Sequence, residues 1–275
     1  MFGNSAEKPA SGHMANEIER KRIIITGGTE GIGNAIAKDL FAGGGDIAIC
    51  ARTKRAVDRF AEENEGAVAL QVDLSDRRAA ASFVVDSIRD LGGLDALILN
   101  AAVTGMTEDD VEVFKVNQVA QVAMTREAAE ALKKNHGRVV FLSSAAKNIE
   151  GAESYGASKK RIEEWLQEFS ERPENEGIAI FSVIPGSCDT RMHKDVLEHG
   201  SGAVKDRTER IIEAGVLRNP EIVGRIISKM ALSGMKFDAE TGEYDNPIGQ
   251  CEVVAISDEN IEAEQMMIVQ KGPAA

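Results

Sequence analysis

The stretch Ile23-Ile24-Ile25-Thr26-Gly27-Gly28-Thr29-Glu30-Gly31-Ile32-Gly33 decides the fold. Its three β-branched residues in a row predict a short buried strand, and the glycines after them predict a sharp turn. A helix is expected next and should end at a run of three glycines. Before that run, apolar residues recur at helical spacing, namely Ile32, Ala35, Ile36, Leu40 and Phe41. Such a turn lets a backbone approach a pyrophosphate, and the helix start offers free N–H groups. The alternative is that the glycines only form a tight connection between strand and helix. The position of the turn, after the first strand and before a helix, favours a phosphate site.

Apolar runs alternate with helical segments along the rest of the chain. The further runs cover residues 47–50, 68–72, 94–99, 139–142 and 178–184. Helices are expected at residues 76–91, with Ser75 as the N-cap, and after Asn219-Pro220, where a cap precedes a proline suited to the first helical position. This alternation predicts a parallel sheet covered by helices on both faces. We therefore predict a doubly wound α/β (Rossmann) fold, as a single domain over residues 15–275.

Composition narrows the possible functions. A formal net charge of -13 argues against nucleic acid and anionic membrane surfaces as partners, and solubility alone would explain it. Cys50, Cys188 and Cys251 are widely spaced, which indicates free thiols in a reducing compartment and a cytoplasmic protein without a metal site. No apolar run approaches the roughly 20 residues that span a bilayer. Residues 1–14 have the character of a cloning leader.

The C-terminal part is expected to contain a turn at residues 240–243 and strands at 251–256 and 265–269. The last of these includes four consecutive apolar residues, from Met266 to Val269. We predict that this segment pairs at a sheet edge or docks on a neighbouring subunit, since it is too apolar for a free tail.

The stretch Tyr155-Gly156-Ala157-Ser158-Lys159 carries candidate chemistry. On a helix, Tyr155 and Lys159 would lie one turn apart on the same face. A free tyrosine titrates near ~10 and is a poor acid at neutral pH, but a nearby ammonium favours its phenolate. If only the spacing of Tyr155 and Lys159 is considered, the alternative is a surface helix that has a tyrosine at its start. The same helix has an apolar stripe, in the core or at a subunit interface, at Ile162, Trp165, Leu166 and Phe169.

The segment after the second predicted strand bears on cofactor choice. Rossmann proteins that use NAD commonly hold the adenosine ribose with an acidic residue at this strand's end. Ala51 stands there instead and Arg52 follows it. A guanidinium suits a 2′-phosphate, so we favour NADP over NAD, with an exposed loop arginine as the alternative.

Taken together, these features resemble the short-chain dehydrogenase/reductase family, in its classical subfamily, over about residues 22–190. The motifs occur in the family's order along the chain. They are Thr26-Gly27-x-x-x-Gly31-x-Gly33, Asp73, Asn100-Ala101-Ala102, Asn117, Ser143-Ser144, Tyr155-x-x-x-Lys159, and Pro185-Gly186 with Thr190.

The resemblance implies hydride transfer between a nicotinamide and a carbonyl or alcohol carbon. Tyr155 would be the general acid in reduction, and Ser144, with Ser143 in reserve, would hold the carbonyl oxygen. Lys159 would bind the nicotinamide ribose and lower the pKa of Tyr155. Asn117 would hold a water that links Lys159 to solvent.

The resemblance also implies a cofactor site and a substrate lid. Asp73 would lie near the adenine and Thr190 near the carboxamide, while Glu30 stands where NADP-dependent members often carry a basic residue. Residues 191–218 would form the lid, and two histidines there, His193 and His199, make a poor metal site. The implied cofactor contacts are Gly27, Thr29, Glu30, Gly31, Ile32, Gly33, Arg52, Asp73, Leu74, Asn100, Ala101, Tyr155, Lys159, Pro185, Gly186 and Thr190.

The leading hypothesis is an NADP(H)-dependent reductase of a small ketone or aldehyde, similar to carbonyl or 3-oxoacyl reductases and assembled as a homodimer or homotetramer. An NAD(H)-dependent alcohol dehydrogenase is one alternative. Another is a dinucleotide-sensing regulator that has lost catalysis. Regulators of that kind usually lose the tyrosine or the lysine, and this chain keeps both.

Overall fold

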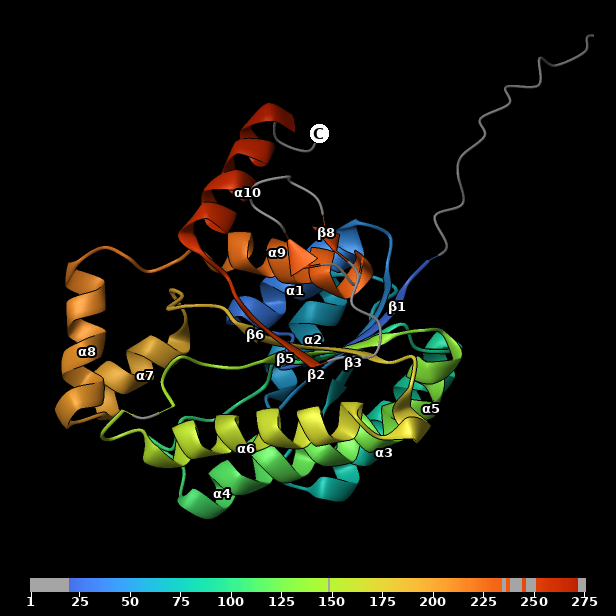
Figure 1. The fold of residues 1–275 in the computed structure, drawn as a ribbon, viewed down its shortest axis with the longest axis horizontal. Coiled ribbons are helices and arrows are strands. Elements are labelled where there is room, and N and C mark those ends of the chain that lie inside the picture. The colour runs from blue at the N-terminus through green and yellow to red at the C-terminus, as the bar shows by residue number, and fades with distance from the viewer. Residues whose placement is uncertain (1–19, 148, 234–235, 238–243, 246–250, 272–275) are drawn as a thin grey trace, which may run out of the picture.

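Seven parallel strands form one sheet in the order β3-β2-β1-β4-β5-β6-β9 (Figure 1). The structure, a computed structural model, describes residues 20–147, 149–233, 236–237, 244–245 and 251–271. The strands of this sheet are β1 (Arg22–Thr26), β2 (Asp46–Ala51), β3 (Val68–Gln71), β4 (Ala96–Leu99), β5 (Arg138–Leu142), β6 (Ala179–Ile184) and β9 (Cys251–Ala255). Two short strands, β7 (Lys236–Phe237) and β8 (Tyr244–Asp245), pair antiparallel outside it.

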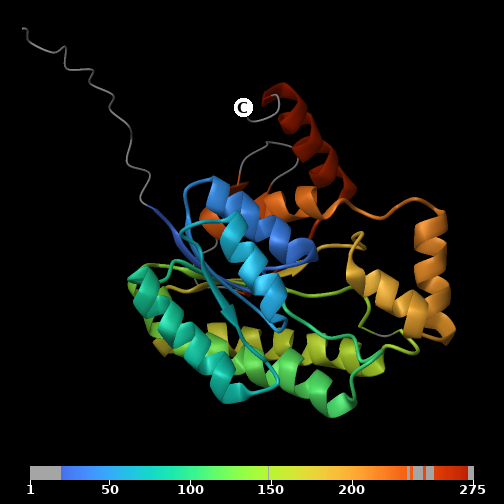
Figure 2. The same ribbon diagram turned by 180° about the vertical axis from the view of Figure 1, so that it is seen from behind.

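Helices cover both faces of the sheet, as Figures 1 and 2 show from opposite sides. One face carries α1 (Gly31–Ala42), α2 (Lys54–Glu63) and α9 (Pro220–Ser233). The other carries α3 (Arg77–Leu91), α4 (Asp110–Phe114), the π-helix η1 (Lys115–Ala120), α5 (Gln121–Lys134) and α6 (Glu153–Ser170). A 3₁₀ turn, η2 (Pro173–Asn175), follows α6, and the remaining helices are α7 (Arg191–His199), α8 (Gly202–Glu213) and α10 (Asp258–Lys271).

The alternation of side chains along each strand explains this layering. Ile23 and Ile25 of β1 lie in the core cluster on the α1 face, whereas Ile24 lies in the cluster on the α3 face, and all three are fully buried. A strand buried on both faces needs a continuous apolar run, and each run predicted from the sequence overlaps one strand of the sheet. The predicted doubly wound fold is confirmed.

The parallel pairing brings the ends of all seven strands to one edge of the sheet. β1 is the switch point, because it pairs with β2 on one side and with β4 on the other. In doubly wound sheets, ligands bind outside the carboxyl ends of the strands at such a point. The predicted site motifs follow β1, β2, β3, β4, β5 and β6 and therefore share this edge.

Two expected helix starts have different outcomes. Asn219 caps α9 as predicted, since its Oδ1 accepts a hydrogen bond from the Glu221 N–H at 2.8 Å. The prediction of Ser75 as the cap of α3 is wrong. Asp76 is the N-cap, and its carboxylate accepts from the N–H groups of Arg78 and Ala79. Asp73 instead holds Ser75, through the Ser75 N–H at 2.9 Å.

The C-terminal segment corrects another prediction. The strand expected at 251–256 is confirmed as β9, but the strand expected at 265–269 is wrong, because these residues belong to α10. Ser257 and Asn260 form a reciprocal cap, in which the Asn260 N–H donates to Ser257 Oγ and Asn260 Oδ1 accepts from the Ser257 N–H. This cap starts a helix, so the segment cannot extend the sheet edge. The turn expected at 240–243 lies outside the described residues.

Both α6 and α10 pack against the rest of the protein. Ile162, Leu166 and Phe169 of the α6 stripe are buried in the core cluster. α10 packs on α9, where the buried Glu264 carboxylate pairs with Lys229 at 2.5 Å.

The cap of α10 yields a stability prediction. Ser257→Ala should lower the free energy of unfolding by about 1 kcal/mol, because the N–H of Asn260 loses its acceptor. Chemical denaturation would measure the difference. Glu262→Ala, an exposed change in the same helix, is the matched control and should be nearly neutral. Equal effects of the two variants would contradict the role of the cap.

Candidate active site

The turn between β1 and α1 is closely packed against the end of β4. Gly27 has φ +66°, and a Cβ there would lie 2.9 Å from Asn100 Nδ2. A Cβ on Gly33 would lie 2.1 Å from the Gly27 carbonyl oxygen and 2.4 Å from the same Asn100 nitrogen. Glycine is therefore required at both positions, because any side chain there would collide with the neighbouring segments.

Hydrogen bonds across the sheet fix this turn. Asn100 Nδ2 donates to the carbonyls of Thr26 and Gly27 at 2.9 and 3.1 Å. Thr26 Oγ1 accepts from the backbone N–H groups of Asn100 and Ala101, each at 3.0 Å. Asn100 and Ala101 thus hold the glycine turn from the neighbouring strand.

Tyr155 and Ser144 lie side by side at the start of α6. Tyr155 is partly buried, and desolvation raises the pKa of its phenol, while hydrogen bonding with the Ser144 side chain acts in the opposite direction. Ser144 Oγ also accepts from the Ala146 N–H at 3.0 Å. Ser143 points elsewhere. Its buried hydroxyl makes no hydrogen bond of ordinary geometry, yet it is close enough to Glu163 to lower the pKa of that carboxyl.

Lys159 is almost completely buried below Tyr155. Its Nζ donates to the Leu142 carbonyl at 2.6 Å and lies 4.8 Å from the centroid of the Phe141 ring and 5.6 Å from that of Tyr155. Burial lowers the pKa of Lys159 to about 7, and the charge of Glu163 partly opposes this. The Lys159 ammonium therefore loses its proton close to neutral pH.

Asn117 lies in the π-helix η1, and its side chain is fully engaged. Its Oδ1 accepts from the Val103 N–H at 2.9 Å, and its Nδ2 donates to the Val103 carbonyl at 2.8 Å and to Ser158 Oγ at 3.1 Å. Asn117 thereby joins the loop after β4 to the Tyr155 helix. Its proposed water-holding role stays a prediction.

Arg52 is exposed at the end of β2 and pairs with a residue that the sequence analysis did not identify. Its Nη1 lies 3.2 Å from Glu112 Oε1 of α4. The charges of Arg52 and Lys115 also help to lower the pKa of Asp73, after the larger effect of hydrogen bonds from Ser75. Glu112 lies 60 residues away from Arg52 in sequence, so no local pattern could reveal the pair. Glu30, also exposed, is the N-cap residue of α1, and Leu74 is buried in the core.

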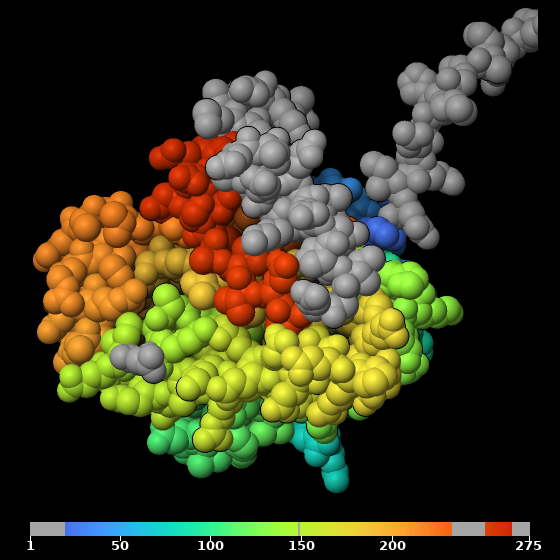
Figure 3. Space-filling view, viewed as in Figure 1, coloured from blue at the N-terminus to red at the C-terminus, as the bar shows by residue number. Residues whose placement is uncertain are grey.

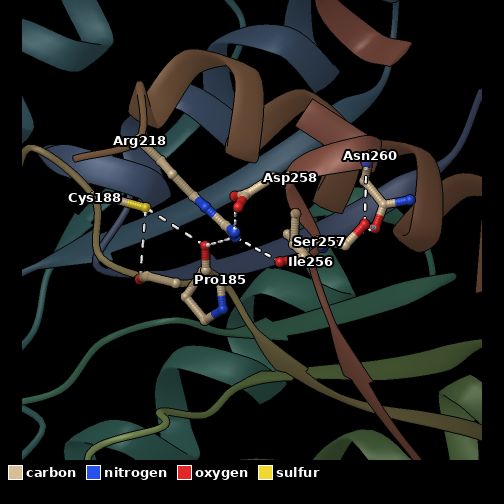
Figure 4. A network of polar contacts seen from close by, with 8 residues as sticks. Pro185, Cys188, Arg218, Ile256, Ser257, Asp258 and Asn260 are labelled. Atoms are coloured by element: carbon tan, nitrogen blue, oxygen red, sulfur yellow. Dashed lines mark hydrogen bonds and ion pairs between the residues drawn. The ribbon is translucent and has the colours of Figure 1, made fainter. Parts of the chain in front are cut away.

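Arg218 anchors the loop after β6 (Figure 4). Its Nη1 donates to the carbonyls of Pro185 and Ile256 at 3.1 and 2.5 Å, and its Nη2 lies 2.6 Å from Asp258. Gly186 has φ +77°, and a Cβ there would lie 2.6 Å from Arg218 Nη1. The expected cofactor residues Pro185 and Gly186 are thus tied to the start of α10. Arg218 was not singled out from the sequence, because its partners, two backbone carbonyls and the Asp258 carboxylate, are distant along the chain.

The remaining predicted residues border the glycine turn. A Cβ on Gly31 would lie 3.2 Å from Thr190 Cγ2, so the residues after β6 reach the start of α1, where Thr29 and Ile32 are close to Gly31 in sequence. The segment 191–218 forms α7 and α8. Val196 and Val204 of these helices cluster with Ala152, Met106 and Ile149, next to the Tyr155 helix. In Figure 3 the α7–α8 surface, in orange, stands beside the yellow-green surface that precedes α6.

No group of three or more His, Cys, Asp or Glu side chains that could hold a metal ion occurs among the described residues. Within the same part of the chain, every helix is too short or too polar to cross a membrane.

A family model described as short chain dehydrogenase matches residues 21–200. The chain belongs to this family. One short-chain dehydrogenase relative, mdpC of Emericella nidulans, is 29% identical over 69% of this chain and 77% of its own length. The cyclic-di-GMP-binding biofilm dispersal mediator protein of Escherichia coli is also 29% identical, over 77% of this chain and 89% of its own.

Solved structures of short-chain dehydrogenases have a similar fold. One from Burkholderia cenocepacia, in complex with NADP, is 26% identical with a TM-score of 0.66 and covers 86% of this chain and 96% of its own. One from Saccharomyces cerevisiae is 22% identical with a TM-score of 0.73, over 88% and 98% of the two chains, and shows likeness of fold alone.

Short-chain dehydrogenases bind a nicotinamide dinucleotide, and the residues of this chain fit one. Glycine at positions 27 and 33 lets the turn pack directly against Asn100 and Ala101. In Rossmann folds, glycines in this turn let a pyrophosphate approach the backbone closely. The start of α1 supplies free N–H groups on the same side.

The contact at Gly33 can be tested by substitution. Gly33→Ala should lower the free energy of unfolding by about 1–3 kcal/mol, since the new methyl group overlaps the Gly27 carbonyl and the Asn100 amide. Thermal or urea denaturation would measure the loss. Gly43→Ala, where the nearest atom would lie 3.4 Å from the methyl group, is the matched control. A Gly33→Ala protein as stable as this control would show that the turn has room to relax.

Proposed function

We propose that this short-chain dehydrogenase is an NADP(H)-dependent oxidoreductase that reduces a small ketone or aldehyde, with Tyr155 as the general acid. The observation that carries the proposal is the grouping of Ser144, Tyr155 and Lys159 at the sheet edge that also holds the glycine turn. Bound NADPH would supply the hydride. The protein's own residues would bind it, orient the substrate and deliver the proton.

Tyr155 donates the proton to the oxygen that becomes the alcohol. Ser144 lies beside the phenol and is positioned to hydrogen-bond the same carbonyl oxygen. The Lys159 ammonium, 5.6 Å from the Tyr155 ring, stabilises the phenolate left after proton transfer. Lys159 is also suited to hold the ribose hydroxyls, because an ammonium has three donors and its contact with the Leu142 carbonyl uses one.

The rest of the cofactor site follows from the strand ends. The glycine turn and the start of α1 would hold the pyrophosphate, and Asp73 and Leu74 would border the adenine. Asn100, Ala101, Pro185, Gly186 and Thr190 would enclose the nicotinamide half. The helices α7 and α8 would form the substrate lid, since they pack on the loop that leads to Tyr155.

Three observations support NADP(H) over NAD(H). Ala51 leaves no carboxylate at the end of β2 for a ribose, and Arg52 follows at the surface. The Burkholderia cenocepacia short-chain dehydrogenase is described in complex with NADP. The acidic Glu112 and Glu30 act against this preference, so its strength depends on whether Arg52 leaves Glu112 for the phosphate.

A ligand-sensing role without catalysis is the second candidate, favoured by the name of the Escherichia coli relative. The retention of both Tyr155 and Lys159, with the lysine buried and held, supports catalysis instead. A cytoplasmic location remains our prediction and is supported by the three free cysteines. A homodimer or homotetramer also remains a prediction, supported by the exposed Val253 on the edge strand β9.

The proposal is tested by following NADPH oxidation against a panel of ketones and aldehydes, with NADH in parallel. We expect turnover of at least one carbonyl class and a preference for NADPH. Tight dinucleotide binding without turnover of any of the carbonyls would favour the sensing role.

Tyr155→Phe should lower kcat by about 10²–10⁴, because only the proton donor is lost. The affinity for NADPH, measured by fluorescence titration, should stay nearly unchanged. Ser154→Ala, one residue earlier on the same helix, is the control. If Tyr155→Phe kept more than about a tenth of kcat, another group would be the acid.

Arg52→Ala should remove a charge-assisted contact of about 1.5–3 kcal/mol, and so raise Kd for NADPH roughly 10- to 150-fold. Kd for NADH should change little, because NADH has no phosphate at that position. Isothermal titration with both cofactors would measure the effect.

Two companion variants separate the acidic neighbours. Glu112→Gln should tighten NADPH binding, since it frees the Arg52 guanidinium from its ion pair. Glu30→Ser should do so only if its carboxylate repels the phosphate. The NADP assignment is wrong if the unaltered enzyme prefers NADH or if Arg52→Ala weakens both cofactors equally.

A further inference from the structure

Glu163 lies one turn beyond Lys159 on α6, in the centre of a largely buried polar cluster. Its side chain is 13% exposed and forms an ion pair with Lys147, from the loop after β5. Its other carboxylate oxygen accepts from Ser182 Oγ of β6 at 2.7 Å. Three elements of the fold therefore fix one carboxylate beside the proposed catalytic lysine.

The groups that face this carboxylate keep it charged. Burial alone would raise the pKa of Glu163, but Lys147, Ser143 and Ser182 together bring it below its usual range. On the β9 side the nearby Cys251 thiol is neutral, since burial and acidic neighbours raise its pKa to about 11. From α6 itself, the facing charge is that of Lys159.

Lys159 needs such a partner. Its Nζ donates to one carbonyl, that of Leu142, and lies near the Phe141 and Tyr155 rings, but burial still disfavours its charge. Residues four apart on a helix are neighbours, which brings the Glu163 charge within reach of Lys159. The ion pair with Lys147 limits this effect, because the two charges of the pair act on Lys159 with opposite sign.

We propose that Glu163 is a positioning residue that keeps the Tyr155–Lys159 pair protonated for catalysis, with Lys147 as the counter-charge that moderates it. The inference rests on the proposed function, in which Tyr155 donates a proton and Lys159 acts as its ammonium.

The two members of the ion pair have opposite expected effects, which separates electrostatics from structural support. Glu163→Gln removes the negative charge but keeps an acceptor for Ser182 and leaves the Lys147 charge nearby. The alkaline limb of the kcat/KM profile for reduction should then move to lower pH, by about 0.5–1 unit. Lys147→Gln removes the positive charge and should move the limb to higher pH.

The sign follows from the proton balance of the pair. Reduction needs Tyr155 with its proton and Lys159 as the ammonium, and activity falls as pH rises and the coupled pair loses a proton. A negative charge nearby delays that loss, and a positive charge advances it. The double variant, Lys147→Gln with Glu163→Gln, should fall between the two single variants.

A readout independent of turnover keeps this test apart from that of the proposed function. The ¹³Cε signal of Lys159 can be titrated by NMR in the cofactor-free protein and identified by its loss in Lys159→Met. The titration midpoint should fall in Glu163→Gln and rise in Lys147→Gln. If these shifts occur but no carbonyl is reduced, the electrostatic inference holds and the proposed function fails.

Shifts in the same direction, or shifts below about 0.2 unit in both variants, would overturn the inference. Either result would mean that the cluster only supports the packing of α6 on β6. If Glu163→Gln does not fold, Lys147→Gln decides alone. It must then move both the NMR midpoint and the alkaline limb upward.

Discussion

The structure depends on the close approach of three backbone segments at the end of β1. Gly27, Gly33 and Asn100 come so near one another that a single methyl group at either glycine would overlap a main-chain or amide atom. Asn100 and Thr26 then supply the hydrogen bonds that hold the segments together. Because β1 is also the switch point of the sheet, this contact lies at the place where doubly wound sheets bind their ligands.

The proposed chemistry depends on a second constraint, the burial of an amine. Lys159 is held by the Leu142 carbonyl at the end of β5, so its position depends on the pairing of the sheet as well as on α6. A buried ammonium is unstable without compensation, and its pKa of about 7 shows the cost. Glu163, itself held by Lys147 and Ser182, offsets part of that cost. The charged groups near Tyr155 are therefore best understood as one coupled system.

The outer parts of the site are held by long-range contacts of a different kind. Arg218 joins the ends of β6 and β9 to the start of α10, and so connects the Pro185-Gly186 loop to the C-terminal helix (Figure 4). Arg52 pairs with Glu112 at the opposite side of the sheet edge. Both arginines have partners that are distant along the chain, so substitutions in α4 or α10 can alter the site without touching it.

A parallel sheet, the succession of its strands and helices along the chain, and the candidate site residues could be predicted from the sequence alone. The physical reason is that these features are local: β-branched runs such as Ile23-Ile24-Ile25 form buried strands, and glycines mark the turns. The strand predicted at 265–269 is part of the last helix, because periodicity cannot tell whether a short run of consecutive apolar residues is a strand or a helix. The signal for a helix is the Ser257–Asn260 cap that precedes the run. The tertiary structure was needed to show that Arg52 pairs with Glu112, that Arg218 ties three segments together, and that Lys147 and Ser182 hold the largely buried Glu163. Those contacts join residues that the fold, rather than chain proximity, brings together, and their charges acquire meaning only from the burial that the fold imposes.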